Sequence, residues 1–172
     1  RGRDFRKISL KDKAAMMNNY SNILMNYSPK IQSSIVDYAD RYSTVYFANS
    51  QGSYIQREKP YLSVHFTAIA RDGNDVQMAH ESTGSIRGYD VAEQLSSIAQ
   101  KAAQRAVNLL KASSVRGGEY TVILDPVLAG VFIHEAFGHL SEADFLYEDP
   151  RMQKLMQLGK NVGSTDLSVV DD

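Results

Sequence analysis

A long stretch rich in β-branched and aromatic residues, between two amphipathic patterns, most constrains the fold of this chain. Within residues 31–86 apolar and polar side chains alternate, most clearly where Leu62, Val64 and Phe66 are separated by single polar residues. Turn-forming sequences at residues 49–52 and 72–75 interrupt the stretch. Because alternation with a period of two is typical of strands that bury one face, the stretch predicts an antiparallel β-meander.

Helical patterns lie on both sides of this stretch. Ser9, with Asp12 three residues later, has the spacing of a helix N-cap and predicts a helix over residues 10–27. Asp90 and Glu93 have the same spacing and predict a second helix that begins at Asp90, with an apolar stripe that ends at Leu109. The predicted fold class is α+β, an antiparallel meander with flanking amphipathic helices.

The last third of the chain has a different pattern. A short strand is predicted over residues 119–124, followed by a helix that begins with Asp125 as N-cap and Pro126 at its first position. A short helix is expected around residues 151–158 and a strand over 167–170. We therefore expect an α+β region over residues 1–118 and a second region, with the metal motif described below, over residues 119–172.

Composition excludes several classes of protein. The chain has no cysteine, so any metal site built from its own side chains must use histidine and carboxylates. Its 19 basic and 20 acidic residues give a formal charge of -1, which offers no electrostatic attraction for a nucleic-acid backbone. No apolar run approaches the roughly 18 residues that a membrane span requires. We therefore expect a cytoplasmic protein that contacts neither nucleic acid nor membrane directly.

Two histidines with a glutamate directly after the first follow the apolar start of the helix at Pro126. Zinc peptidases place two ligands and a general base in this way, usually with the second histidine four positions after the first. Here His134 and His139 are five residues apart, and on a regular α-helix they would point about 140° apart. A π-bulge would return both to one side, and Gly138 weakens the helix at the required place. The sequence therefore predicts a distorted helix through the motif.

The run from His134 to His139, preceded by residues 120–126 and followed by residues 142–145, resembles the metal motif of the TldD/PmbA family. These proteins are metallopeptidases once described as modulators of DNA gyrase. The resemblance implies that His134 and His139 bind zinc and that Glu135 polarises the attacking water. It also implies a third ligand, a cysteine of the C-terminal domain, which this chain lacks.

On this resemblance, we expect the chain to be the N-terminal part of the motif-bearing TldD-like branch, truncated before the C-terminal domain. The expected function is zinc-dependent hydrolysis of peptides or unfolded proteins, and the chain by itself is expected to be inactive. The partner is expected to be a second copy or a PmbA-like subunit without the motif.

Several alternatives are open at this point. Glu142 has the spacing to act as a third metal ligand, and His65 and His80 would lie diagonally across a hairpin, where they could form a second metal site. Tyrosines of the meander could line a peptide groove. The chain could also be a non-catalytic peptide-binding or scaffold module, and direct binding to DNA or gyrase is disfavoured by the balanced charge. The tyrosines concerned are Tyr38, Tyr42, Tyr46, Tyr54 and Tyr61.

Overall fold

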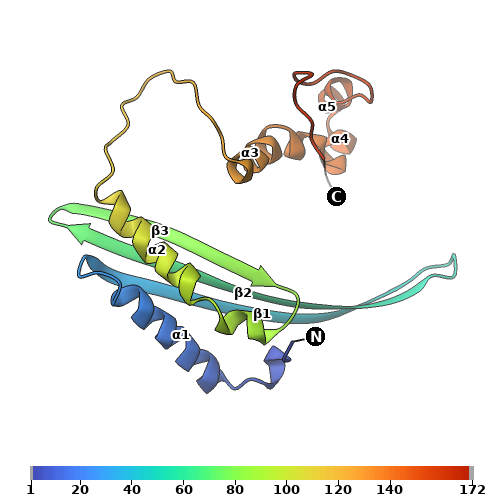
Figure 1. Ribbon diagram of the computed structural model, residues 1–172. Helices are drawn as coiled ribbons and strands as arrows, with labels where there is room; N and C mark the ends of the chain where they lie inside the picture. Colours follow the sequence, from blue (N-terminus) through green and yellow to red (C-terminus); the bar gives the residue numbers. More distant parts are fainter. Residues whose placement is uncertain (1, 171–172) are drawn as a thin grey trace. The chain divides into compact units, whose positions relative to one another are not determined.

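The computed structural model describes residues 2–170. The chain divides into two compact units, Arg1–Val115 and Arg116–Asp172, and each is described by itself. The first contains the sheet and two long helices, and the second contains only short helical segments and loops (Figure 1). The predicted α+β class is confirmed.

The sheet is an antiparallel meander of three strands in the order β1-β2-β3. Its strands are β1 (Ile31–Ala48), β2 (Tyr54–Asp72) and β3 (Asp75–Ser85). The second turn lies where the sequence predicted it, because Asp72 pairs with Asp75 and Gly73 takes a φ of +60° that glycine tolerates. The predicted meander is therefore confirmed.

The first two strands extend well beyond the third. The last residue pair between β2 and β3 is Leu62 with Ser85, whereas β1 and β2 stay paired out to Ala48 and Tyr54. Residues 41–48 and 54–61 thus form a two-stranded projection, here called the hairpin arm (Figure 1). Over this length β2 has a neighbouring strand on one side only.

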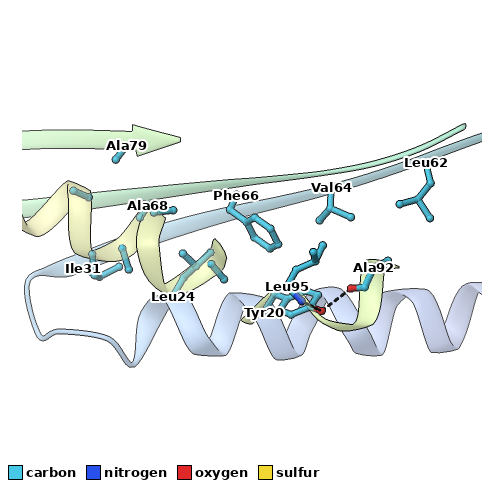
Figure 2. Packing of buried hydrophobic residues seen from close by; sticks show 14 of the residues in the cluster. Tyr20, Leu24, Ile31, Leu62, Val64, Phe66, Ala68, Ala79, Ala92 and Leu95 are labelled. Carbon is cyan, nitrogen blue, oxygen red and sulfur yellow. Dashed lines mark hydrogen bonds between the residues drawn. The ribbon is translucent and has the colours of Figure 1, made fainter. Parts of the chain in front are cut away.

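Helices α1 (Leu10–Met25) and α2 (Ser96–Leu109) pack on one face of the sheet (Figure 2). Ser9 caps α1 as predicted, since its side chain accepts a hydrogen bond from the Asp12 N–H at 3.1 Å. Between helices and sheet lies a continuous hydrophobic core. Its fully buried side chains include Tyr20, Leu24, Leu62, Val64, Phe66, Ala68, Ala99 and Ala102.

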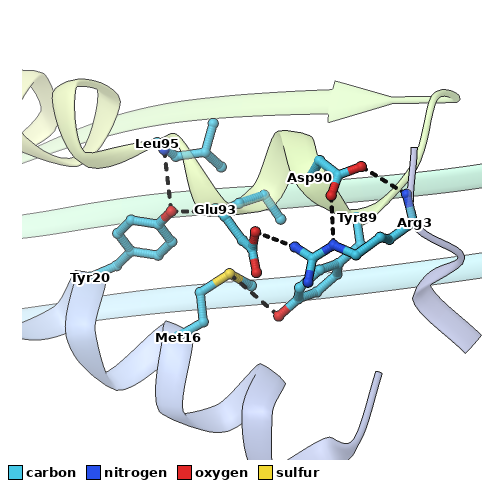
Figure 3. Close-up of polar contacts among 8 residues, drawn as sticks. Arg3, Met16, Tyr20, Tyr89, Asp90, Glu93 and Leu95 are labelled. Carbon is cyan, nitrogen blue, oxygen red and sulfur yellow. Dashed lines mark hydrogen bonds and ion pairs between the residues drawn. The ribbon is translucent and has the colours of Figure 1, made fainter. Parts of the chain in front are cut away.

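A buried tyrosine joins α1 to the segment before α2. The Tyr20 hydroxyl donates to the Ala92 carbonyl at 2.5 Å and accepts from the Leu95 N–H at 3.2 Å (Figure 3). Its ring meets Phe66 edge to face, with centroids 5.4 Å apart. Tyr20 therefore satisfies two backbone groups that burial would otherwise leave unpaired.

The predicted start of the second long helix at Asp90 is wrong. Residues Tyr89–Glu93 form a 3-10 helix, η2, and α2 begins only at Ser96. The Asp90 carboxylate accepts from the Arg3 backbone N–H at 2.7 Å and from its guanidinium at 2.6 Å, and Glu93 also pairs with Arg3 (Figure 3). Because Arg3 takes both carboxylates, neither caps the helix.

The second unit contains α3 (Pro126–Ile133), α4 (Ala143–Glu148) and α5 (Pro150–Leu155). Between α3 and α4 lie a π-helical turn, η3 (His134–Gly138), and a 3-10 turn, η4 (His139–Ser141). The strands predicted at residues 119–124 and 167–170 do not form. A strand needs a neighbour to pair its backbone groups, and neither segment has one in the described chain.

Candidate metal centre

The helix that leads into the motif begins at the predicted residues. The Asp125 side chain accepts hydrogen bonds from the N–H groups of Val127 at 2.9 Å and Leu128 at 3.2 Å. Pro126 occupies the first helical position, where its missing N–H costs nothing. Two local features of the sequence therefore fix where α3 starts, eight residues before the first histidine.

The helix changes its hydrogen-bond spacing at the motif. His139 donates its backbone N–H to the carbonyl of His134, five residues earlier, and residues His134–Gly138 form the π-turn η3. This wider turn brings the two imidazoles together, with ring centroids 4.5 Å apart and planes at 71°. The predicted distortion is confirmed, and a regular helix would have separated the rings.

Gly138 lies within this turn, but no neighbouring atom is so close that only glycine fits at this position. Its backbone is helical, and an added Cβ would meet the His134 ring at 3.7 Å, an ordinary contact distance. The glycine therefore lowers the helix propensity locally, as expected, but it does not open space for the histidine.

His134, Glu135 and His139 form the one group of metal-type side chains among residues 2–170 in which three possible ligand atoms converge. These atoms lie within 4.8 Å of one another, and all three residues are exposed. Two ligands at about 2.1 Å from one ion lie at most about 4.2 Å apart. The spacing of these ligand atoms is therefore close to the spacing that a shared ion requires.

Glu142 contacts the far nitrogen of the second histidine. Its Oε1 lies 2.5 Å from Nδ1 of His139, whose Nε2 is 3.7 Å from Glu135. This hydrogen bond raises the pKa of His139, and the neighbouring Glu135 charge adds a smaller increase. With Nδ1–H donating to Glu142, the Nε2 lone pair is free to bind a cation on the Glu135 side.

Glu142 was considered from the sequence as a third ligand. The structure instead gives it the position in which carboxylates orient metal-binding histidines, which is a contact on the other ring nitrogen. The spacing of three residues after His139 indicated a shared face, but only the coordinates show which ring nitrogen it contacts.

A hollow of about 790 Å³ lies beside the motif within the second unit. His134, Phe137 and Glu142 line one part of it, and residues 167–170 line another. The segment predicted as a terminal strand thus lines the same hollow as the motif-bearing turn. The site residues of the chain are therefore next to a space large enough for several atoms of a ligand.

Two further predictions from the sequence concerned a second metal site at His65 and His80 and a groove lined by the tyrosines of the meander. His65 and His80 are diagonal neighbours on β2 and β3 as expected, but the Nδ1 of His80 bonds to the Thr67 hydroxyl, and no third metal-type side chain joins them in residues 2–170. Of the five tyrosines, Tyr42 and Tyr61 line one hollow of the first unit, whereas the other three do not line it.

Comparison with family models decides what kind of protein carries this geometry. The model described as the PmbA/TldA metallopeptidase central domain matches residues 3–110, and that of the C-terminal domain of the same metallopeptidases matches residues 117–172. The chain belongs to the TldD/PmbA family. The expectation that it is the N-terminal part of such a protein is corrected, because the matched regions are the central and C-terminal domains of TldD/PmbA proteins.

Curated TldD/PmbA relatives are named as metalloproteases. A metalloprotease of Synechocystis sp. is 46% identical over 99% of the chain, which spans 37% of that protein. One from Methanocaldococcus jannaschii is 36% identical over 93% of the chain and 35% of its own length. A zinc metalloprotease TldD homolog of Saccharolobus solfataricus is 29% identical over 99% of the chain and 38% of its own length. The chain thus spans little more than a third of these relatives.

Two solved structures share the fold. One from Bacteroides thetaiotaomicron, described as a candidate modulator of DNA gyrase, has a TM-score of 0.64 at 21% identity, over 79% of this chain and 31% of that one. A similarly described protein from Thermotoga maritima has a TM-score of 0.58 at 20% identity, over 67% and 26%. Within the described residues of the present TldD/PmbA chain, no helix has the length and apolar character needed to cross a bilayer.

Proposed function

We propose that this chain supplies the metal-binding and proton-transfer groups of a zinc-dependent peptidase. In this proposal His134 and His139 bind the zinc ion and Glu135 is the general base. The π-turn carries the proposal, because it brings both imidazoles and the Glu135 carboxylate within 4.8 Å of one another despite the five-residue spacing. The names of the metalloprotease relatives point in the same direction.

Each side chain has a separate task. Zinc, when bound, lowers the pKa of a coordinated water to about 7 and polarises the scissile carbonyl. Glu135 is next to the first histidine and exposed, so its carboxylate can take a proton from that water and pass it to the leaving amine. Glu142 holds His139 with Nε2 free for the ion. The chain then needs no side-chain nucleophile.

The donor set within this chain is incomplete for catalysis. Catalytic zinc normally has three protein ligands, the chain has no cysteine, and Glu142 is hydrogen-bonded to His139. We infer that the third donor lies outside these residues and is the cysteine that the family resemblance implies. The 172-residue chain by itself is then expected to bind zinc weakly and to be inactive.

The proposed substrates are peptides or unfolded protein segments, and the proposed assembly contains a second copy or a PmbA-like subunit. A short peptide segment is of a size to occupy the hollow of about 790 Å³ beside His134, which residues 167–170 also line. Such a space accommodates a few residues of a peptide rather than a folded domain.

The decisive experiment compares Glu135→Gln with His134→Ala in the full-length protein and its partner subunit. Glu135→Gln removes the base and keeps both imidazoles, so zinc content should stay near that of the unmodified protein while peptide cleavage falls by about 10² to 10⁴. His134→Ala removes a ligand, so zinc and cleavage should be lost together. Elemental analysis and a fluorogenic peptide assay measure the two quantities.

Glu148→Gln is the matched control, because Glu148 is an exposed carboxylate on α4 outside the metal-type group. Glu148→Gln should change neither the zinc content nor the rate of peptide cleavage. Near-normal cleavage by Glu135→Gln would exclude Glu135 as the base, and loss of zinc from that variant would make it a ligand instead.

A further inference from the structure

Along the hairpin arm, one edge of β2 has no partner strand among residues 2–170. Residues 54–61 pair with β1 on one side, and β3 stops at Ser85, opposite Leu62 (Figure 1). Unpaired N–H and C=O groups on such an edge can accept another strand. Pro60, near the base of this edge, has no N–H to donate to a neighbouring strand.

A notch opens where β3 ends. It has a volume of about 650 Å³ and is enclosed by residues 2–6, 57–61 and 86–88, with Tyr42 on β1. All of these residues belong to the first unit, whereas the metal motif belongs to the second. Its volume is in the range of ligand sites in proteins.

The notch has an excess of free positive charge. Arg57, Lys59 and Arg87 are exposed, and none of them forms an ion pair with a carboxylate of residues 2–170. The other two arginines of the notch are engaged, Arg3 with Asp90 and Arg6 with its neighbouring carboxylate. Three unpaired cations gathered in one notch contrast with the formal charge of -1 of the whole chain.

The two acidic residues of the notch do not cancel this charge. Asp4 forms an ion pair with Arg6 at 2.7 Å. Glu58 forms no ion pair within residues 2–170 and keeps its charge, and its interaction with the Tyr42 hydroxyl raises the pKa of Tyr42. The guanidinium of Arg6 also stacks over the Tyr42 ring, 3.6 Å from its centroid. Within residues 2–170 the three free cations therefore outnumber the one free carboxylate of the notch, Glu58, and an incoming anion meets a net positive charge.

The arm beyond the notch is apolar on both faces. Tyr54 is 73% exposed and Ile55 is 54% exposed, and Phe47 lies opposite Ile55 at 50%. An isolated two-stranded hairpin is only marginally stable in water, and a third strand would add main-chain hydrogen bonds and cover apolar surface.

We propose that the notch and the adjoining free edge of β2 bind an extended acidic peptide segment. The segment pairs with β2 as an added strand, and its carboxylates face Arg57, Lys59 and Arg87. This site goes beyond the proposed metallopeptidase activity and does not depend on it. The other explanation of the charged residues is that they protect the edge from aggregation, as Lys and Pro do on many edge strands.

Charge reversal separates the two explanations, because glutamate protects an edge as lysine does but repels an acidic ligand. The probe is a fluorescein-labelled peptide of alternating threonine and glutamate, added to the full chain in the presence of EDTA. Arg57→Glu with Lys59→Glu should weaken binding at least about tenfold. The matched control, Arg71→Glu with Lys111→Glu, makes the same change in net charge at exposed positions outside the notch and should weaken binding far less.

Two further probes test the chemistry of the ligand. A peptide with glutamine in place of glutamate should bind at least about tenfold more weakly, and so should one with alternate backbone amides methylated, which cannot pair as a strand. Raised salt should weaken binding of the acidic peptide. Unchanged affinity in Arg57→Glu with Lys59→Glu would overturn the proposal, and so would full binding of the methylated peptide or equal affinity for a single-stranded oligonucleotide.

Because the binding assay contains EDTA, its outcome is independent of the zinc site. Loss of zinc or of cleavage with intact peptide binding would count against the metallopeptidase alone. Conversely, absent peptide binding in a zinc-loaded, active protein would count against the notch alone. Arg87→Gln, which leaves both strands of the arm unchanged, gives an independent variant and should weaken binding of the acidic peptide in the same direction.

Discussion

The two units of the chain are built in different ways. Every buried hydrophobic residue in the described chain belongs to the first unit, where two helices cover one face of the sheet (Figure 2). In the second unit the apolar residues of α3 stay exposed, among them Val127 at 79% and Phe132 at 58%. The first unit thus has a core of its own, whereas residues 116–170 of the second unit contain no buried hydrophobic side chain.

The comparison shows that the metal motif owes its geometry to local backbone chemistry. Four local features position the two histidines: the side-chain cap at Asp125, the proline at the first helical position, the π-turn, and the contact of Glu142 with His139. None of these needs a packed core. The exposed apolar face of α3 is the surface on which the rest of a longer protein is expected to pack.

The largest effect that tests this difference is the loss of a core aromatic. Phe66→Ala removes a fully buried ring that contacts Tyr20, so it should lower the free energy of unfolding by about 3 to 5 kcal/mol. Phe132→Ala, at a half-exposed position of α3, should change it by less than about 0.5 kcal/mol. Urea denaturation of the chain, followed by circular dichroism, measures both. Equal losses would show that the second unit has a core after all.

A smaller effect is expected from the buried hydroxyl of Tyr20. Tyr20→Phe keeps the ring but leaves the Ala92 carbonyl and the Leu95 N–H without partners (Figure 3). Unsatisfied buried groups cost about 1 to 3 kcal/mol, so the unfolding midpoint in urea should fall without a change in its slope. A midpoint that does not move would mean that water replaces the hydroxyl at this site.

In the second unit, the corresponding polar contact should affect metal affinity instead of stability. Glu142→Gln weakens the hold on Nδ1 of His139, so zinc affinity of the full-length protein should fall about tenfold to 100-fold. Isothermal titration with zinc measures this, and the urea midpoint of the chain should not change. Complete loss of zinc, equal to that of His134→Ala, would make Glu142 a ligand.

Local patterns in the sequence were sufficient to predict the elements whose determinants are close in the chain. Ser9 and Asp125 cap the helices that they were expected to cap, and the alternation around Val64 predicted the meander. The five-residue spacing of the histidines, joined to helix geometry, predicted the π-turn. In each case the residues that decide the structure lie within a few positions of one another.

Predictions failed where a distant partner decides the outcome. Asp90 has the spacing of a cap, but Arg3, 87 residues away, takes its carboxylate. Residues 119–124 and 167–170 have strand-like composition but no strand beside them in the described chain. The contact of Glu142 with Nδ1 of His139 depends on side-chain rotamers, which spacing alone does not fix. The roles of His134, Glu135 and His139 in binding and catalysis stay predictions.

The smallest expected effect compares the same kind of helix cap in the two units. Ser9→Ala removes the acceptor for the Asp12 N–H of a helix packed on the core, so it should lower the free energy of unfolding by about 1 kcal/mol. Asp125→Ala removes the acceptor for Val127 and Leu128 in a helix without a core, so the urea midpoint should not change. Instead, hydrogen exchange at those two amides should become faster, because opening of that turn is not linked to global unfolding. If Asp125→Ala lowered the midpoint as much as Ser9→Ala, the two units would unfold as one cooperative body, and the separation of the metal motif from the core would not hold.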